Sequence, residues 1–281
     1  MRFFNLIIIA LVMASTFACA SEKDYVAKIK TRHGEIVAVF FDDTPEHKSN
    51  FISLAEAGRF DSTEFHRIIK GFMVQGGDVF TKEGLPPAVW PTLPAEIRSN
   101  HFHKKGMIAA ARQGNSINPE RRSNGSQFYI VTGEVYDEES LKTDMVLLQE
   151  AFLKYIQLGS NSDLKDEYSR LYNERKFDSL TTLLVSKRAE IEESLNVKLT
   201  KDFSKEQTEA YTTIGGAPHL DGEYTVFGEV ISGMDVVEKI AAEPTGNRDV
   251  PLETVYMTVT IEKMSKKKIE KEYGYQYPAK K

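Results

Sequence analysis

The chain has 281 residues, 41% of them hydrophobic and 27% charged, which is typical of a globular protein that buries a sizeable core in one large domain or two ordinary ones. Its formal net charge of −5 gives no reason to expect a nucleic-acid partner. The single cysteine, Cys19, excludes an intramolecular disulfide.

Residues 1–20 have the pattern of an export signal. Arg2 precedes an apolar run over residues 3–13, which is too short to span a bilayer, and a segment of small residues follows. The end of this segment fits an Ala-x-Ala cleavage site, which would release a soluble protein, and it also resembles a loose lipobox in which Cys19 becomes lipidated. A cysteine used only at the cleavage point favours the lipoprotein. We therefore expect an exported protein of the periplasm or cell envelope, attached to a membrane through Cys19.

Strand and helix signals follow from residue 25. Alternating runs at 26–31 and 35–40 flank a turn at His33-Gly34 and predict a β-hairpin. Thr44-Pro45 then predicts the start of a helix that ends near Gly58, with apolar residues at helical spacing. We expect this helix to close one end of a β-barrel.

The stretch from Phe65 to Asp78 is the most informative part of the sequence. Its alternation predicts a strand with Met73 and Gln75 on one face and Phe72 on the other. An apolar strand beside an arginine is by itself typical of a protein core. Taken as a whole, however, the fourteen residues resemble the signature of the cyclophilins, which are peptidyl-prolyl cis-trans isomerases. Lys70 departs from the pattern, where the family more often has proline.

Two further blocks carry the same resemblance, at 106–132 and at 219–240, and a final strand at 255–263 closes the domain. The resemblance covers about 25–132 and 214–263. It implies a mainly β fold, a cyclophilin-like closed antiparallel β-barrel capped by helices, formed by residues 24–135 and 209–264.

The segment 136–208 separates the two parts of this barrel and has a different character. It is poor in Gly and Pro, rich in Glu, Lys and Leu, and its apolar residues recur at helical intervals. We expect an inserted α-helical segment of two or three helices packed as a hairpin on the barrel surface. It is either a folded ornament or an arm that binds clients or a partner. The lysine-rich residues 265–281 are expected to form a solvated, charged C-terminal tail.

The chemistry implied by the resemblance needs neither metal nor cofactor. A catalyst of Xaa-Pro rotation must stabilise the twisted amide, and a guanidinium that donates to the prolyl nitrogen does so. The resemblance implies a catalytic set of Arg67, Gln75 and Tyr129, and a substrate-binding set of Phe72, Met73, Ala111, Arg112, Gln127, His219, Leu220 and Tyr224. The pair His101 and His103 lacks the accompanying ligands of a metal site, and none is expected.

Several positions depart from the family pattern. Tyr129 stands where many members have Phe, and Tyr224 stands where His is frequent. His219 replaces the Trp of the best-known members, which implies weaker cyclosporin binding with isomerisation largely retained. Arg112 replaces a common Asn and is expected to add charge to the groove. The loop 113–122 is longer than usual and brings Arg121 and Arg122 near the site. We expect a solvated basic loop, and the alternative is a bias toward substrates with acidic flanks.

The sequence therefore predicts a peptidyl-prolyl cis-trans isomerase that assists the folding of exported proteins. Its partners would be proline-containing polypeptides, including unfolded or partly folded exported proteins, and no nucleic acid. The alternative is a module that binds proline segments, or a holding chaperone whose helical insertion is the client arm. Arg67 argues against a pure binder, because binding alone does not require that donor.

Overall fold

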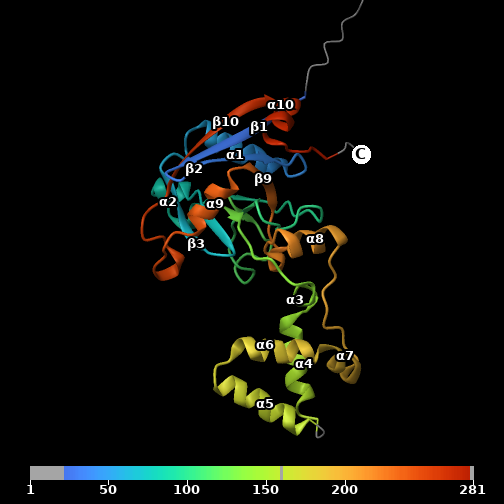
Figure 1. Cartoon of the computed structure of the whole chain (residues 1–281). Coiled ribbons are helices and arrows are strands. Elements are labelled where there is room, and N and C mark those ends of the chain that lie inside the picture. Colours follow the sequence, from blue (N-terminus) through green and yellow to red (C-terminus); the bar gives the residue numbers. More distant parts are fainter. Residues whose placement is uncertain (1–21, 159–160, 279–281) are drawn as a thin grey trace, which may run out of the picture.

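A computed structural model describes residues 22–158 and 161–278, so Cys19 and the predicted signal segment lie outside the described residues. Eight antiparallel strands form a closed barrel in the order β1-β10-β3-β4-β8-β6-β9-β2, which confirms the expected fold class (Figure 1). The strands are β1 (Lys23–Thr31), β2 (Gly34–Phe40), β3 (Thr63–Ile69), β4 (Met73–Gly76), β6 (Met107–Ala110), β8 (Phe128–Val131), β9 (Val226–Ser232) and β10 (Tyr256–Ser265). A separate two-stranded sheet pairs β5 (Thr92–Leu93) with β7 (Ser123–Asn124).

Alternation along the strands sends side chains to two different clusters. On β4, β6 and β8, Val74, Ile108 and Phe128 point into the barrel core. Their neighbours Met73 and Tyr129 belong to a second cluster on the outer face of the same strands. Successive residues of a strand point to opposite faces, so these three strands bury both of their faces. The second cluster forms the floor of the site described below.

Two helices pack into the barrel core from its margins. Helix α1 (Pro45–Glu56) begins with proline at its first turn, where a missing N–H costs nothing, and buries Phe51 against Phe60 and Phe128. Helix α9 (Met234–Ala241) buries Val237 and Ile240 in the same core. The shorter helices of the barrel loops are α2 (Val79–Lys82) and the 3₁₀ turns η1 (Pro87–Val89), η2 (Pro218–Leu220) and η3 (Asn247–Asp249).

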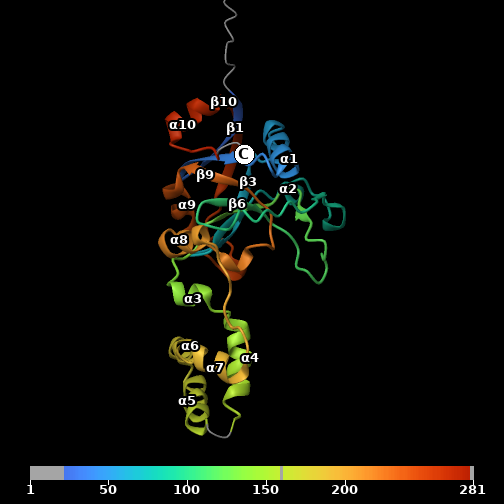
Figure 2. The same ribbon diagram turned by 90° about the vertical axis from the view of Figure 1, so that its right-hand side faces the viewer.

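In the described residues between the two parts of the barrel, the structure has six helices. They are α3 (Glu138–Lys142), α4 (Met145–Tyr155), α5 (Ser162–Asn173), α6 (Phe177–Ser186), α7 (Arg188–Leu195) and α8 (Lys205–Thr213). Figures 1 and 2 show α4–α7 as a separate lobe, called the arm here, that extends away from the barrel, with α3 and α8 between the two. The expectation of two or three helices packed on the barrel was wrong, because the apolar stripes pack mainly on one another. Phe152 and Ile191 are completely buried within the arm.

Helices α3 and α8, called the base here, pack against the barrel. Leu141 of α3 and Tyr211 of α8 share a buried cluster with Phe102 of the barrel. A capping box between Ser204 and Gln207 fixes the start of α8. Thr143 and Thr200 form an isolated β-bridge where the chain passes from base to arm and back. The structure thus divides the insertion into a base joined to the barrel and an arm beyond it.

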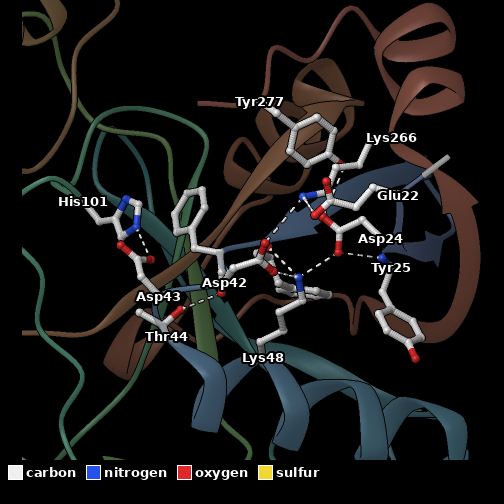
Figure 3. Close-up of polar contacts among 12 residues, drawn as sticks. Glu22, Asp24, Tyr25, Asp42, Asp43, Thr44, Lys48, His101, Lys266 and Tyr277 are labelled. Atoms are coloured by element: carbon white, nitrogen blue, oxygen red, sulfur yellow. Dashed lines mark hydrogen bonds and ion pairs between the residues drawn. The ribbon is translucent and has the colours of Figure 1, made fainter. Parts of the chain in front are cut away.

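The C-terminal segment is not the solvated tail that we expected. It forms helix α10 (Lys266–Tyr273), whose Ile269 is completely buried. Tyr273, Tyr275 and Tyr277 join Ile269 in covering Val26, Val37 and Val39 of the first two strands. Figure 3 shows the polar edge of this contact, where Tyr277 donates to Asp24 and Lys48 lies 2.7 Å from the same carboxylate. The apolar contacts of Ile269 and the tyrosines keep this lysine-rich segment packed against β1 and β2.

Within residues 22–158 and 161–278, no helix combines the length and hydropathy needed to cross a membrane.

Candidate active site

A row of strand partners brings the central predicted residues together. Arg67 of β3 pairs with Gln75 of β4, Gln75 pairs with Tyr129 of β8, and Tyr129 pairs with Ala109 of β6. Direct partners in an antiparallel sheet have Cβ atoms about 4.5–5.5 Å apart and point to the same face. Residues more than 60 positions apart in the sequence therefore line one outer surface of the barrel.

These residues border a cavity of about 100 Å³. It is lined by nine of the predicted site residues, which are Arg67, Phe72, Met73, Gln75, Ala111, Arg112, Tyr129, Leu220 and Tyr224. The other two predicted residues lie next to it. Gln75 donates to the side-chain oxygen of Gln127 over 3.0 Å, and the His219 ring lies 5.1 Å from that of Phe72. Aliphatic and aromatic side chains form part of its walls, and Arg67, Gln75 and Arg112 supply polar groups.

Phe72 differs from its predicted orientation. It lies in the turn before β4, which begins at Met73, so the strand alternation does not extend to it. Phe72 and Met73 consequently line the same cavity instead of pointing to opposite faces.

The Arg67 side chain is about half exposed, at 43%, and one side of it is held in place. Its Nε lies 3.3 Å from Oδ2 of Asp249, and no other described residue accepts a hydrogen bond from the guanidinium. Asp249 and its neighbour Arg248 both have φ of +61°, a conformation that is uncommon for residues other than Gly. No motif in the sequence predicted that this loop would supply the partner of Arg67. The arrangement leaves the terminal nitrogens of Arg67 available at the cavity rim.

Arg112 carries its charge within the cavity wall and not in the open groove. Its side chain is only 4% exposed, and its Nη2 lies 2.9 Å from a carboxylate oxygen of Glu223. The guanidinium carbon lies 4.4 Å from the centre of the Tyr224 ring, a cation–π contact. Arg121 pairs with the same Glu223 carboxylate, so this cluster keeps a net positive charge. The cation–π contact holds Tyr224 as a wall of the cavity.

The backbone beside Arg112 offers an open edge. The N–H of Ala111 already donates to Gln127, and its carbonyl accepts from Asn124. Within the described part of the chain, nothing bonds the backbone N–H or carbonyl of Arg112. An extended peptide could therefore pair at Arg112 but not at Ala111.

A second cavity, of about 530 Å³, continues from the first. Gln75, Ala111 and Arg112 line both, and Trp90, Ile117, Arg122 and Gln127 are among the other residues around the larger one. The long loop thus forms part of its wall. The two extra arginines of the loop are engaged within the protein, since Arg121 pairs with Glu223 and Arg122 donates to Thr92. These contacts hold both side chains in place, and among the described residues no carboxylate pairs with Arg122.

Two residues that sequence reasoning missed stand behind the cavity wall. His103 Nε2 lies 3.0 Å from the Tyr129 hydroxyl, and Nδ1 of the same ring lies 3.0 Å from Asp221. Burial raises the pKa of Tyr129 well above its usual value, so its hydroxyl remains protonated. The sequence signal for His103 was visible, but we considered this histidine only as a metal ligand. Among the described residues, no group of three or more His, Cys, Asp or Glu side chains could hold a metal ion.

Comparisons with known proteins agree with this geometry. A sequence model of the family described as cyclophilin type peptidyl-prolyl cis-trans isomerase/CLD matches residues 26–169 and 196–262. A Streptococcus pyogenes protein, provisionally named a bifunctional phosphatase/peptidyl-prolyl cis-trans isomerase, is 29% identical over 83% of this chain and 37% of its own length. A Staphylococcus aureus protein, provisionally named a peptidyl-prolyl cis-trans isomerase, is 26% identical over 80% of this chain and 85% of its own. The chain thus spans about a third of the streptococcal relative and most of the staphylococcal one.

The fold also has a counterpart among solved structures. The crystal structure of a cyclophilin type peptidyl-prolyl cis-trans isomerase from Cryptosporidium parvum superposes with a TM-score of 0.50 at 18% identity. The match covers 85% of this chain and 98% of that one. At this level of identity the likeness concerns the fold alone.

Proposed function

Because the chain belongs to the cyclophilin-type peptidyl-prolyl cis-trans isomerase family, we propose that it accelerates rotation about Xaa-Pro bonds at the cavity beside Arg67. The observation that carries this proposal is the row of strand partners that places Arg67 and Gln75 beside a cavity with aromatic and aliphatic side chains in its walls. Proline-containing polypeptides are the substrate class that such a cavity fits.

The reaction sets simple demands on the site. Rotation about the peptide bond meets a barrier of about 18–20 kcal/mol, because the amide loses its double-bond character as it twists. In the twisted state the prolyl nitrogen becomes pyramidal and gains a lone pair. A donor to that nitrogen stabilises the twisted state more than either planar isomer. Arg67 is suited to this role because its guanidinium remains charged and its terminal nitrogens face no other described acceptor.

The surrounding groups hold the substrate while the bond rotates. The proline ring would lie against Phe72, Met73 and Leu220 in the smaller cavity. The open backbone of Arg112 would pair with the peptide, and the larger cavity would take residues that flank the proline. No nucleophile or cofactor is needed, since no covalent bond is made or broken.

We also propose that this activity assists the folding of exported proteins, and that the protein is anchored at the cell envelope through Cys19. The support is the signal-like pattern of residues 1–20 and the position of the single cysteine. Mass spectrometry of the mature N-terminus tests the anchor. A lipid-modified Cys19 is expected, and an unmodified chain that begins at Ser21 would contradict it.

The isomerase proposal is tested by measuring kcat/KM on a short Xaa-Pro peptide. Arg67→Ala should lower the value by at least about tenfold, because it removes the donor to the twisted amide. Arg59→Ala is the matched control, since Arg59 pairs with Glu83 on the surface and does not border the cavity. Absence of acceleration by the parent protein would refute the proposal and leave a module that only binds proline segments.

A further inference from the structure

A chain of hydrogen bonds runs from the helical insertion to the wall of the isomerase cavity. The hydroxyl of Tyr211, on α8, donates to Asp221 Oδ2 over 2.7 Å. Asp221 Oδ1 lies 2.8 Å from the backbone nitrogen of His103 and 3.0 Å from its Nδ1. The ring continues to the Tyr129 hydroxyl, 3.0 Å from Nε2. These hydrogen bonds connect three parts of the polypeptide, which are His103, Tyr129 and the segment 211–221.

The order of donors in the chain follows from the carboxylate. A carboxylate that accepts a hydrogen bond from the His103 ring requires a proton on Nδ1. In the tautomer whose single proton is on Nδ1, Nε2 accepts and the Tyr129 hydroxyl donates to it. Burial and the neighbouring Asp221 raise the pKa of Tyr211, so its hydroxyl also remains a donor. Each polar group in the chain has a partner, which is the condition for burying such groups at low cost.

This series of hydrogen bonds fixes two walls of the isomerase cavity. Tyr129 lines the cavity directly, and its ring orientation is set by the bond to His103. Leu220 lines it as well and is the residue immediately before Asp221. His103 and Tyr211 are completely buried, so neither bond can be replaced easily by water. A change at α8 therefore reaches the surface against which the proline ring would lie.

We propose that His103 and Asp221 are positioning residues of the isomerase site, and that helix α8 of the insertion acts on the cavity through them. This inference rests on the proposed isomerase function. It also gives part of the insertion a role in the barrel's own reaction. Asp221, His103 and the Tyr129 hydroxyl follow one another in the order of a nucleophile triad, yet the hydroxyl stays protonated. Their role here is to hold the cavity wall.

The first test separates the two bonds of the His103 ring. In His103→Asn the amide nitrogen takes roughly the place of Nδ1, so the bond to Asp221 is kept and the bond to Tyr129 is lost. In His103→Gln the amide reaches the place of Nε2 and keeps the bond to Tyr129. We expect His103→Asn to lower kcat/KM for a short Xaa-Pro peptide about fivefold, mainly through KM, because the wall that binds proline is loosened while Arg67 is intact. His103→Gln should restore part of this loss.

A second background distinguishes positioning from general destabilisation. In Tyr129→Phe the hydroxyl is absent, so His103→Asn should cost less than twofold in kcat/KM relative to that background. A merely structural role for His103 predicts equal losses with and without the hydroxyl, and that result would overturn the inference. Thermal unfolding of each variant shows that the compared proteins are folded.

The link to the insertion is tested by Tyr211→Phe, which removes one hydroxyl and keeps the ring that packs on Phe102. We expect kcat/KM to fall about threefold, again mainly through KM. Tyr172→Phe is the matched control, because it removes the hydroxyl of an exposed tyrosine in the arm. If the parent enzyme is active and Tyr211→Phe behaves like Tyr172→Phe, the inferred link is wrong while the isomerase function stands. If the parent has no activity, the isomerase function itself fails.

Discussion

The barrel and the arm of this protein are organised in opposite ways. The barrel core joins residues from Ala27 to Val259, and the pairings of β1 with β10 and of β2 with β9 close long loops of chain. The core of the arm joins residues from Leu148 to Leu199 and is built from neighbouring helices. The barrel thus depends on register across its strands, whereas the arm depends on local amphipathic helices.

The connection between the two regions is narrow. The Thr143–Thr200 bridge is flanked by backbone hydrogen bonds that include Asp144 to Leu199, and Arg188 donates to the Thr143 hydroxyl. The base, in contrast, shares a buried cluster with Phe102 of the barrel. The insertion is therefore not a single unit, because its base packs against the barrel and its arm has a core of its own. We expect barrel and arm to respond differently to the changes below.

The largest expected effect is on the arm alone. Phe152 is completely buried in the arm core, and Phe152→Ala should destabilise the arm by about 3–5 kcal/mol through lost contacts and the cavity left behind. Hydrogen exchange should show loss of protection in α4–α7 with protection of the barrel strands retained. The adjacent Leu153 is 39% exposed, and Leu153→Ala serves as the control with little expected change. Loss of protection in both regions would show that arm and barrel unfold together.

The C-terminal helix should behave as part of the barrel. Ile269→Ala removes a completely buried side chain between α10 and the outer face of β1 and β2, and should lower the free energy of unfolding of the barrel by about 2–4 kcal/mol. Urea unfolding followed on the barrel measures this loss. Lys267→Ala, at an exposed position of the same helix, should leave the midpoint nearly unchanged. If both variants changed the free energy of unfolding by a similarly small amount, α10 would be a loosely attached tail, contrary to the prediction.

The stability of the barrel should also depend more strongly on pH than that of the arm, since all six histidines lie outside residues 136–208. Burial lowers the pKa of three of them, His47, His66 and His219. The unfolded chain then binds protons that the folded barrel does not, so barrel stability falls as pH drops below about 6.5. Each histidine contributes at most about 1.4 kcal/mol per pH unit.

Unfolding of the barrel measured between pH 7.5 and 5.5 tests this slope. We expect His66→Gln to make it shallower, because it removes one of the three histidines whose pKa is lowered by burial. Hydrogen exchange in the arm should change less over the same range. A stability that is flat with pH, or an arm that loses protection first, would contradict the prediction.

Much of the site could be predicted because its signal is contiguous. Arg67, Gln75 and their neighbours stand in one stretch of fourteen residues, and the closed barrel follows from alternating strands together with the family resemblance. Phe72 was misplaced because the position at which β4 begins depends on tertiary pairing. Asp249 could not be predicted as the partner of Arg67, since 182 residues separate them and only closure of the barrel brings them together.

The same limit applied to the groups behind the cavity and to the chain's C-terminal end. His103 and Asp221 are 118 residues apart, and the sequence around either residue does not indicate that the two side chains are in contact. The lysines of α10 suggested a solvated tail, whereas Ile269 and the spaced tyrosines decide its position. Periodicity predicts which face is apolar, but it does not identify the surface that the face will cover.

The smallest expected effect is the most direct test of the division between arm and base. Thr143 and Thr200 are bridge partners, so replacing residues 144–199 by an Asn-Gly turn should remove the arm and keep the base. Because Tyr211, Asp221 and His103 are untouched, kcat/KM for a short Xaa-Pro peptide should stay within about twofold of the parent. Removal of residues 136–213 also takes away the Tyr211 hydroxyl, and should lower kcat/KM at least as much as Tyr211→Phe does. If both deletions lowered kcat/KM equally, the insertion would act on the site through its arm, and the proposed difference between arm and base would be wrong.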